Sequence, residues 1–135
     1  MVWDLAPHDL SIVTHLLGKD LMTIQATGTC HTGNHAEDVA YLTLDFGHDL
    51  IAYFHVNWLS PVKVHHMIFG GRRSGDMWAP AMDGTEALQV EVGHFLDCIE
   101  HGEKPITDGA AGLWVVKILE AAQMSIKAGG KRVAL

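Results

Sequence analysis

Two neighbouring segments alternate apolar and polar residues, and this alternation constrains the fold more than any other feature. The first segment, residues 39–46, places on one face Ala40, Leu42, Leu44 and Phe46. The second, residues 50–59, opposes Tyr53, His55 and Asn57 to Ala52, Phe54, Val56 and Trp58. Because successive side chains of a strand point to opposite faces, both segments are predicted to be half-buried strands, with Trp58 on the core side. The short connection 47–49 predicts that they pair antiparallel.

The remaining segments add two strands, a short terminal strand and three helices. Further strands are expected over residues 21–29, 62–69 and 131–135. Helices are expected from Pro7 to Leu17, from the capping pair Asp83 and Glu86 to Gly102, and from Asp108 to Gly129. The second helix is expected to bury a stripe formed by Leu88, Val92, Phe95, Leu96 and Ile99.

This order of elements predicts the α+β class, in one domain over residues 1–135, with a mostly antiparallel open sheet and helices on one face. The stretch 72–84 has neither period and is expected to be a loop. The sheet face that carries Tyr53, His55 and Asn57 has no helix left to cover it. We therefore expect a homodimer through this open face, since large exposed apolar faces are costly.

The charge balance and the cysteines limit the partners and the compartment. The 135 residues have a formal net charge of −7 and no long basic run, which argues against nucleic acid and anionic membranes as partners. Neither a membrane-spanning apolar run nor a signal peptide is apparent. Two lone cysteines, Cys30 and Cys98, suit a reducing cytoplasm, where both are expected to be buried thiols.

The N-terminal string Trp3-Asp4-Leu5-Ala6-Pro7-His8 holds the candidate catalytic residues. Asp4 and His8 are four residues apart at the start of a predicted helix, so they lie about one turn apart. A carboxylate near an imidazole orients it and raises its basicity, which suits a general base. The spacing alone favours a plainer interpretation, in which Asp4 caps the helix and His8 is a surface residue.

Several collinear motifs give this chain its resemblance to a known family. They are the N-terminal string, residues 37–40 with 55–58, Arg73–Pro80, residues 85–88 with 91–99, and residues 105–109 with 112–113. In this order they resemble the C-terminal domain of the glucose-fructose oxidoreductase / inositol dehydrogenase (Gfo/Idh/MocA) family, and most nearly its members that act on nucleotide-activated amino sugars.

The resemblance implies both a reaction and a set of site residues. A sugar or polyol hydroxyl would lose its proton to a base while its carbon gives hydride to a nicotinamide. His8 would be the base or a substrate hydrogen-bond donor, and Asp4 its partner. Arg73 and Trp78 would contact the substrate from their loop.

Two departures from the family bear on what the chain can do. Met1 lies three residues before Asp4, so the N-terminal nucleotide-binding domain is expected to be absent. No Gly-x-Gly-x-x-Gly motif follows a predicted strand. The family's catalytic lysine lies in a Glu-Lys-Pro segment, and the same three residues occur here only as Glu103-Lys104-Pro105, in the loop before the last predicted helix. The isolated chain is thus expected to bind no cofactor, although NAD(P) is implied for the complete enzyme. The connection from Phe69 to Arg73 is also shorter than in the family, and this shortening is expected to move the loop that carries Arg73 and Trp78.

Three functions are therefore considered. The first is the substrate-binding and dimerisation domain of an NAD(P)-dependent sugar or polyol oxidoreductase, incomplete as an enzyme by itself. The alternative is a catalytically inert dimerising fragment or scaffold module. The last is a metal-dependent sugar-binding protein built on His31, His35, His65 and His66, although a zinc site needs three or four converging ligands.

Overall fold

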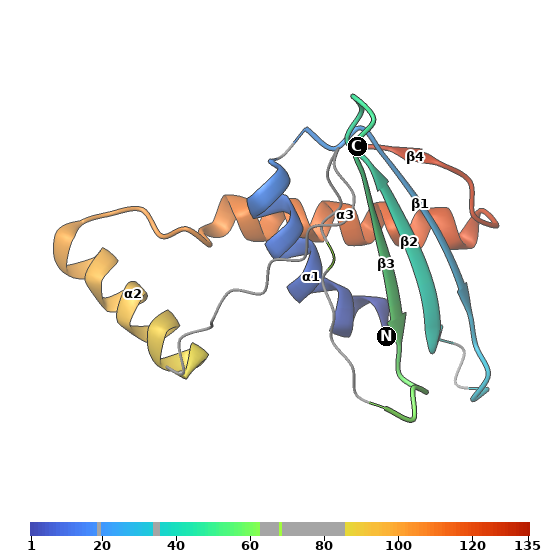
Figure 1. Cartoon of the computed structure of the whole chain (residues 1–135), viewed down its shortest axis with the longest axis horizontal. Helices are drawn as coiled ribbons and strands as arrows, with labels where there is room; N and C mark the ends of the chain where they lie inside the picture. The colour runs from blue at the N-terminus through green and yellow to red at the C-terminus, as the bar shows by residue number, and fades with distance from the viewer. Residues whose placement is uncertain (19, 34–35, 63–67, 69–85) are drawn as a thin grey trace, which may run out of the picture. The chain divides into compact units, whose positions relative to one another are not determined.

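The computed structural model describes residues 1–18, 20–33, 36–62, 68 and 86–135, which divide into two compact units. The first unit comprises residues 1–61 and 107–135, and the second comprises residues 62–106. The first unit contains α1 (Val2–Leu17), β1 (Thr23–Thr29), β2 (Val39–Asp45), β3 (Ile51–Asn57), α3 (Gly109–Lys127) and β4 (Val133–Ala134) (Figure 1). The second contains α2 (Ala87–His101). The predicted α+β class is confirmed.

The four strands form one antiparallel sheet in the order β3-β2-β1-β4. The register of the predicted hairpin places Tyr41 opposite His55 and Leu42 opposite Phe54. The connecting turn is closed by backbone hydrogen bonds between Phe46 and Leu50 and between Leu50 and Gly47. The expected terminal strand is present as β4, which pairs with the first two residues of β1.

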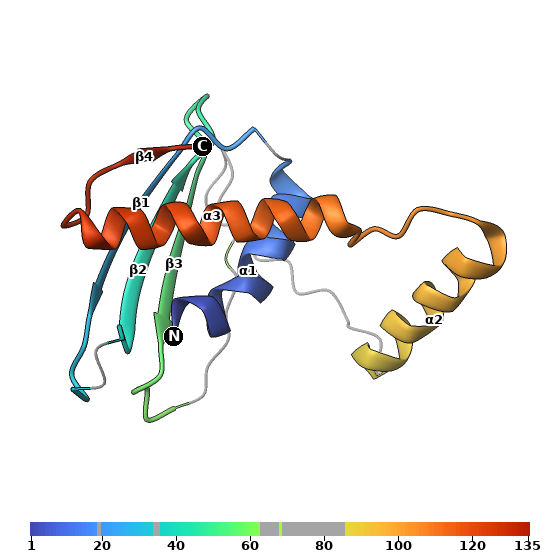
Figure 2. The same ribbon diagram turned by 180° about the vertical axis from the view of Figure 1, so that it is seen from behind.

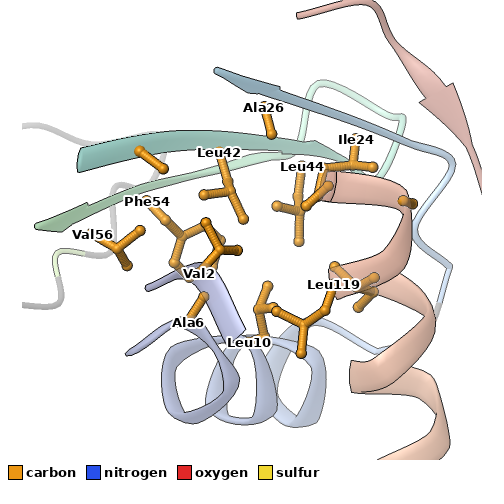
Figure 3. Close-up of a cluster of buried hydrophobic side chains, with 14 of the residues drawn as sticks. Val2, Ala6, Leu10, Ile24, Ala26, Leu42, Leu44, Phe54, Val56 and Leu119 are labelled. Carbon is orange, nitrogen blue, oxygen red and sulfur yellow. The ribbon is translucent and has the colours of Figure 1, made fainter. Parts of the chain in front are cut away.

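Helices α1 and α3 both pack on one face of this sheet, α3 against β1 and α1 against β3 (Figures 1 and 2). The alternating apolar residues of the strands meet the helices there in one core (Figure 3). Its fully buried members include Val2, Ala6, Leu10, Ile24, Ala26, Ala40, Leu42, Leu44, Ile118 and Ala122. The pattern read from residues 39–46 thus places the core correctly.

The first helix is longer than its sequence signals indicate. It begins at Val2, so Pro7 lies inside it and not at its first position. Pro7 has no N–H to donate to the carbonyl four residues earlier, which is a local cost. The extra turn nevertheless buries Val2 and Ala6 against the sheet, and this burial accounts for the earlier start.

The opposite face of the sheet is not covered by the described residues of the first unit, as predicted. Tyr41 and Tyr53 are 42% and 63% exposed there. The Tyr41 ring stacks on that of His55, with centroids 4.7 Å apart, and less closely on that of Tyr53, at 6.0 Å. An aromatic cluster therefore stands on the open face.

The second unit departs from expectation. Helix α2 is capped by Glu86, whose carboxylate accepts the N–H of Gln89, and it ends at Gly102 in the left-handed conformation. Its predicted buried stripe is wrong, because Leu88, Val92, Phe95, Leu96 and Ile99 are all exposed. The described part of this unit contains a single helix, so it offers no second element to cover the stripe.

Other sequence predictions fall in or near this unit. Asp83, the loop 72–84 and nearly all of the strand expected over residues 62–69 lie outside the described residues. Cys98 is buried as expected, whereas Cys30, in the first unit, is exposed. Within the described part of the chain, no helix has the length and apolar character needed to cross a membrane.

Candidate functional site

The candidate site lies at one edge of the sheet. Because β1 and β3 are both antiparallel to β2, their C-terminal ends meet at the edge where β2 begins. The N-terminal turns of α1 belong to the same region, since the indole Nε1–H of Trp58, just after β3, donates to Oδ2 of Asp4 at 3.1 Å. The edge thus brings the N-terminal motif together with a residue 54 positions away in sequence.

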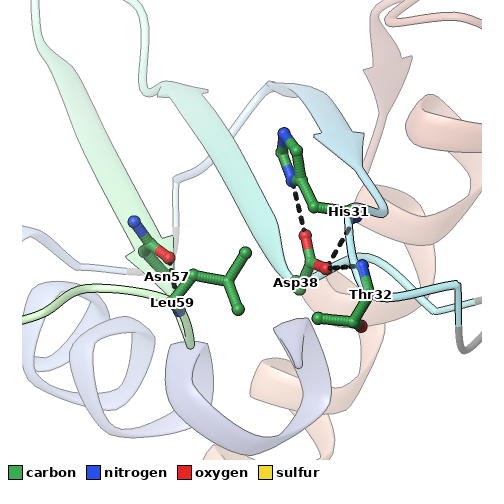
Figure 4. Close-up of polar contacts among 5 residues, drawn as sticks. All are labelled: His31, Thr32, Asp38, Asn57 and Leu59. Atoms are coloured by element: carbon green, nitrogen blue, oxygen red, sulfur yellow. Dashed lines mark hydrogen bonds and ion pairs between the residues drawn. The ribbon is translucent and has the colours of Figure 1, made fainter.

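Asp38 is the buried anchor of this edge (Figure 4). Its carboxylate accepts hydrogen bonds from the backbone N–H groups of His31 and Thr32, at 2.7 and 2.8 Å, and contacts Nδ1 of His31 at 2.9 Å. Burial alone would raise the pKa of the Asp38 carboxyl, but the hydrogen bonds from His31 and Thr32 outweigh it and hold the pKa well below its usual range. Asp38 is therefore a stably ionised group that orders the connection between β1 and β2.

The same residue also fixes the end of β3. The backbone carbonyl of Asp38 accepts the N–H of Trp58 at 2.9 Å. The side-chain oxygen of Asn57 accepts the N–H of Leu59 at 2.7 Å, an Asx-type turn (Figure 4). This turn ends the strand at Asn57, so the alternation no longer governs the next residue. The expectation that Trp58 joins the core is wrong for this reason, and its side chain is 53% exposed.

Asp4 and His8 lie on one face of α1, with Cβ atoms about 5–6 Å apart by helix geometry. Both side chains are exposed. Met1 is the N-cap and no side chain caps the helix, so Asp4 does not have the capping role of the plainer interpretation. The exposure of His8 agrees with that interpretation. Chemically, the pair offers an accessible imidazole one turn from a carboxylate that is held by Trp58.

The other predicted site residues lie elsewhere or cannot be placed. Arg73 and Trp78 are outside the described residues, as are His35, His65 and His66. His31 is engaged with Asp38. In the ranges that the structure describes, no group of three histidine, cysteine or acidic side chains could hold a metal ion.

The described residues do not fit a dinucleotide cofactor. Such cofactors bind where a glycine-rich turn leads from a strand of a parallel sheet into a helix. The sheet here is antiparallel throughout. Among the described residues, no strand is followed directly by a helix. We therefore assign none of these residues to NAD(P).

Two residues of the site were not singled out from the sequence. Asp38 was noted only as part of a strand motif, and Trp58 as part of the motif 55–58 and, by the alternation, as a core residue. Neither carries a local signal for its contact, because Asp38 meets a loop seven residues earlier and Trp58 meets a helix 54 residues earlier. Only the folded sheet edge brings these partners together.

Comparisons with known proteins were made for both the sequence and the fold. Residues 1–74 match the model of the GFO/IDH/MocA C-terminal domain. No curated protein sequence matches the chain. Among solved structures, it is similar to the WlbA dehydrogenase from Bordetella pertussis in complex with NADH and UDP-GlcNAcA, with a TM-score of 0.76 and 21% identity over 99% of this chain and 44% of that one.

Two further structures have the same fold. One is an oxidoreductase from Agrobacterium radiobacter in complex with NAD+, L-tartaric acid and magnesium, with a TM-score of 0.74, 19% identity, and coverage of 99% of this chain and 48% of that one. The other is a myo-inositol dehydrogenase from Corynebacterium glutamicum, with a TM-score of 0.63, 15% identity, and coverage of 98% and 48%. The chain thus spans about half the length of these structures.

Proposed function

Because this chain belongs to the GFO/IDH/MocA C-terminal domain family, we propose that it is the substrate-binding and dimerising half of an NAD(P)-dependent oxidoreductase. Its substrate would be a sugar or polyol hydroxyl. The observation that carries the proposal is the placement of Asp4 and His8 on one exposed face of α1, with the Asp4 carboxylate held by the indole of Trp58.

The chemistry proposed for this chain is the proton half of an alcohol oxidation. A neutral imidazole at His8 would accept the hydroxyl proton of a bound substrate. The negative charge of Asp4, one helical turn away, would stabilise the imidazolium that forms. Both side chains are exposed, so a substrate hydroxyl can reach them without rearrangement of the core.

The cofactor is proposed to be held by a part of the complete enzyme outside these 135 residues. The antiparallel sheet supports this division, because it offers no cradle for the pyrophosphate. It agrees with the length of the similar structures, of which this chain covers 44–48%. The isolated chain is then a binding domain that needs the other half to react.

A nucleotide-activated sugar is the proposed substrate class. The support is the similarity to WlbA, whose structure contains UDP-GlcNAcA, together with the sequence motifs typical of such members. The proposal predicts that the purified chain binds UDP-GlcNAcA and that His8→Ala weakens the binding. His15→Ala is the matched control, because His15 is exposed on the last turn of the same helix.

Isothermal titration calorimetry on the three proteins tests this part of the proposal. Loss of one hydrogen bond to the sugar would weaken binding by about three- to tenfold in His8→Ala and leave His15→Ala unchanged. Equal affinity in all three proteins would remove His8 from the site. An absence of binding to the unsubstituted chain would favour the inert dimerising module instead.

Dimerisation is proposed to use the open face of the sheet. Its support is the exposed cluster of Tyr41, Tyr53 and His55, since aromatic side chains are enriched in protein interfaces. Tyr53→Lys would place a charge within such an interface. We expect this variant to sediment as a monomer at concentrations where the parent chain is a dimer. Met124→Lys, an exposed position on α3, should leave the dimer intact, and a dimeric Tyr53→Lys would refute the assignment.

A further inference from the structure

We propose that Trp58 is a positioning residue for Asp4, and that the buried Asp38 anchors it in that role. The inference rests on the proposed function, in that Asp4 and His8 form the substrate site. It adds a residue that does not belong to the N-terminal motif and that the strand pattern assigns to the core.

The backbone of Trp58 is fixed from two sides. The Trp58 N–H donates to the carbonyl of Asp38, and the Asn57 side chain closes the turn by accepting the N–H of Leu59. Asp38 is itself held by the backbone of His31 and Thr32 (Figure 4). The point from which the Trp58 side chain leaves the sheet is therefore set by the backbone carbonyl of Asp38, a residue whose own carboxylate is buried and held by its neighbours.

The indole of Trp58 makes one hydrogen bond with the Asp4 carboxylate. The indole Nε1–H is a donor only, so it can hold Asp4 in one sense, as an acceptor. It engages Oδ2 at 3.1 Å. Without this bond, the Asp4 side chain would sample its staggered rotamers in water. With it, one carboxylate oxygen is committed to Trp58, and within the described residues the other makes no hydrogen bond and stays available for His8 or for a substrate hydroxyl.

The orientation of the Trp58 side chain differs from the one that the strand pattern predicts. Trp58 leaves 53% of its surface to solvent, although the alternation of β3 would place it in the core. A purely structural tryptophan would gain more by burial, because a tryptophan side chain has a large apolar surface. The Asx turn at Asn57 turns it out of the core face, toward the start of α1. The sheet edge is thus built to present the indole to Asp4.

A spectroscopic experiment on the full chain tests the contact directly. The indole N–H signal of Trp58 is assigned in a ¹H–¹⁵N spectrum by its loss in Trp58→Phe. In Asp4→Ala we expect this signal to shift and to exchange faster with water, while the signal of Trp114 on α3 stays in place. Asp20→Ala removes the same charge from an exposed position elsewhere and should leave the signal unchanged. An unmoved Trp58 signal in Asp4→Ala would overturn the proposal.

Affinity measurements test the positioning role. Trp58→Phe and Asp4→Ala are each expected to weaken UDP-GlcNAcA binding by about three- to tenfold, and the double variant should bind no more weakly than Asp4→Ala. Independent, multiplying losses would contradict positioning through Asp4. If the unsubstituted chain binds no UDP-sugar, the proposed function fails, and the indole signal still decides whether Trp58 holds Asp4.

Discussion

The tie between α3 and the sheet gives the sharpest stability prediction. Ser125 is fully buried on α3, and its hydroxyl oxygen accepts the N–H of Ala26 at 2.8 Å. The hydroxyl lies 2.6 Å from the carbonyl of Lys131 and 3.2 Å from that of Ala26, so its single proton goes to the nearer oxygen. Strand β4 pairs only with Thr23 and Ile24, and Ser125 therefore supplies the partner that Ala26 lacks on that side of β1.

Ser125→Ala would leave the Ala26 N–H buried without a partner. An unsatisfied buried donor costs about 1–3 kcal/mol, and the full burial of this site places the effect near ~2 kcal/mol. Removal of a single oxygen atom leaves little void, so the lost hydrogen bonds dominate the change in unfolding free energy.

Urea unfolding, followed by far-ultraviolet circular dichroism, measures this cost. With a slope of about 1–3 kcal/mol per molar urea, ~2 kcal/mol lowers the midpoint by roughly 1 M at unchanged slope. Ser11→Ala on α1 is the control, because its hydroxyl makes no hydrogen bond with the described residues, and its midpoint should stay within about 0.3 M. A Ser125→Ala midpoint equal to that of the parent would refute the view that Ser125 caps the edge of β1.

Two further predictions concern the ends of the sheet. Asp38→Asn should destabilise the chain at neutral pH. Because the folded state lowers the pKa of Asp38, the difference in unfolding free energy between parent and variant should shrink below about pH 4 and vanish as the pH falls through the folded-state pKa. Urea midpoints measured from pH 7 downward would show this decrease, and a constant difference would contradict it. Gly130→Ala should lower the stability of the fold more than Gly129→Ala. Both glycines have positive φ, but only at Gly130 would a new Cβ lie 2.8 Å from the Thr27 methyl. Equal melting temperatures of the two variants would speak against this packing.

The sheet was predictable from the sequence because its information is local. Residues 39–46 and 51–57 alternate with period two, and the same period names both the core residues and the open face. The helix ends at Gly18 and Gly102 followed equally from single residues. The start of α1 did not, because burial of Val2 against the sheet outweighs the signal from Pro7.

The site was predictable only in part. Asp4 and His8 were named as candidates from the family motif, since their four-residue spacing alone favoured a plainer interpretation, whereas the partner of Asp4 comes from the end of β3. The turn at Asn57 interrupts the alternation one residue before Trp58, and no periodic pattern contains that interruption. The prediction of a buried stripe on α2 is wrong for a different reason. A helical period shows which residues share a face, but it does not show whether another element covers them.

The proposed division of an oxidoreductase into two halves is the central claim, and paired calorimetric titrations of the purified chain test it most directly. One titration uses UDP-GlcNAcA and the other NADH, under the same buffer and protein concentration. We expect measurable binding of the UDP-sugar and none of NADH, because the proposed Asp4–His8 site lies on α1 and the described sheet offers no dinucleotide cradle. Tight binding of NADH to the isolated chain would contradict it.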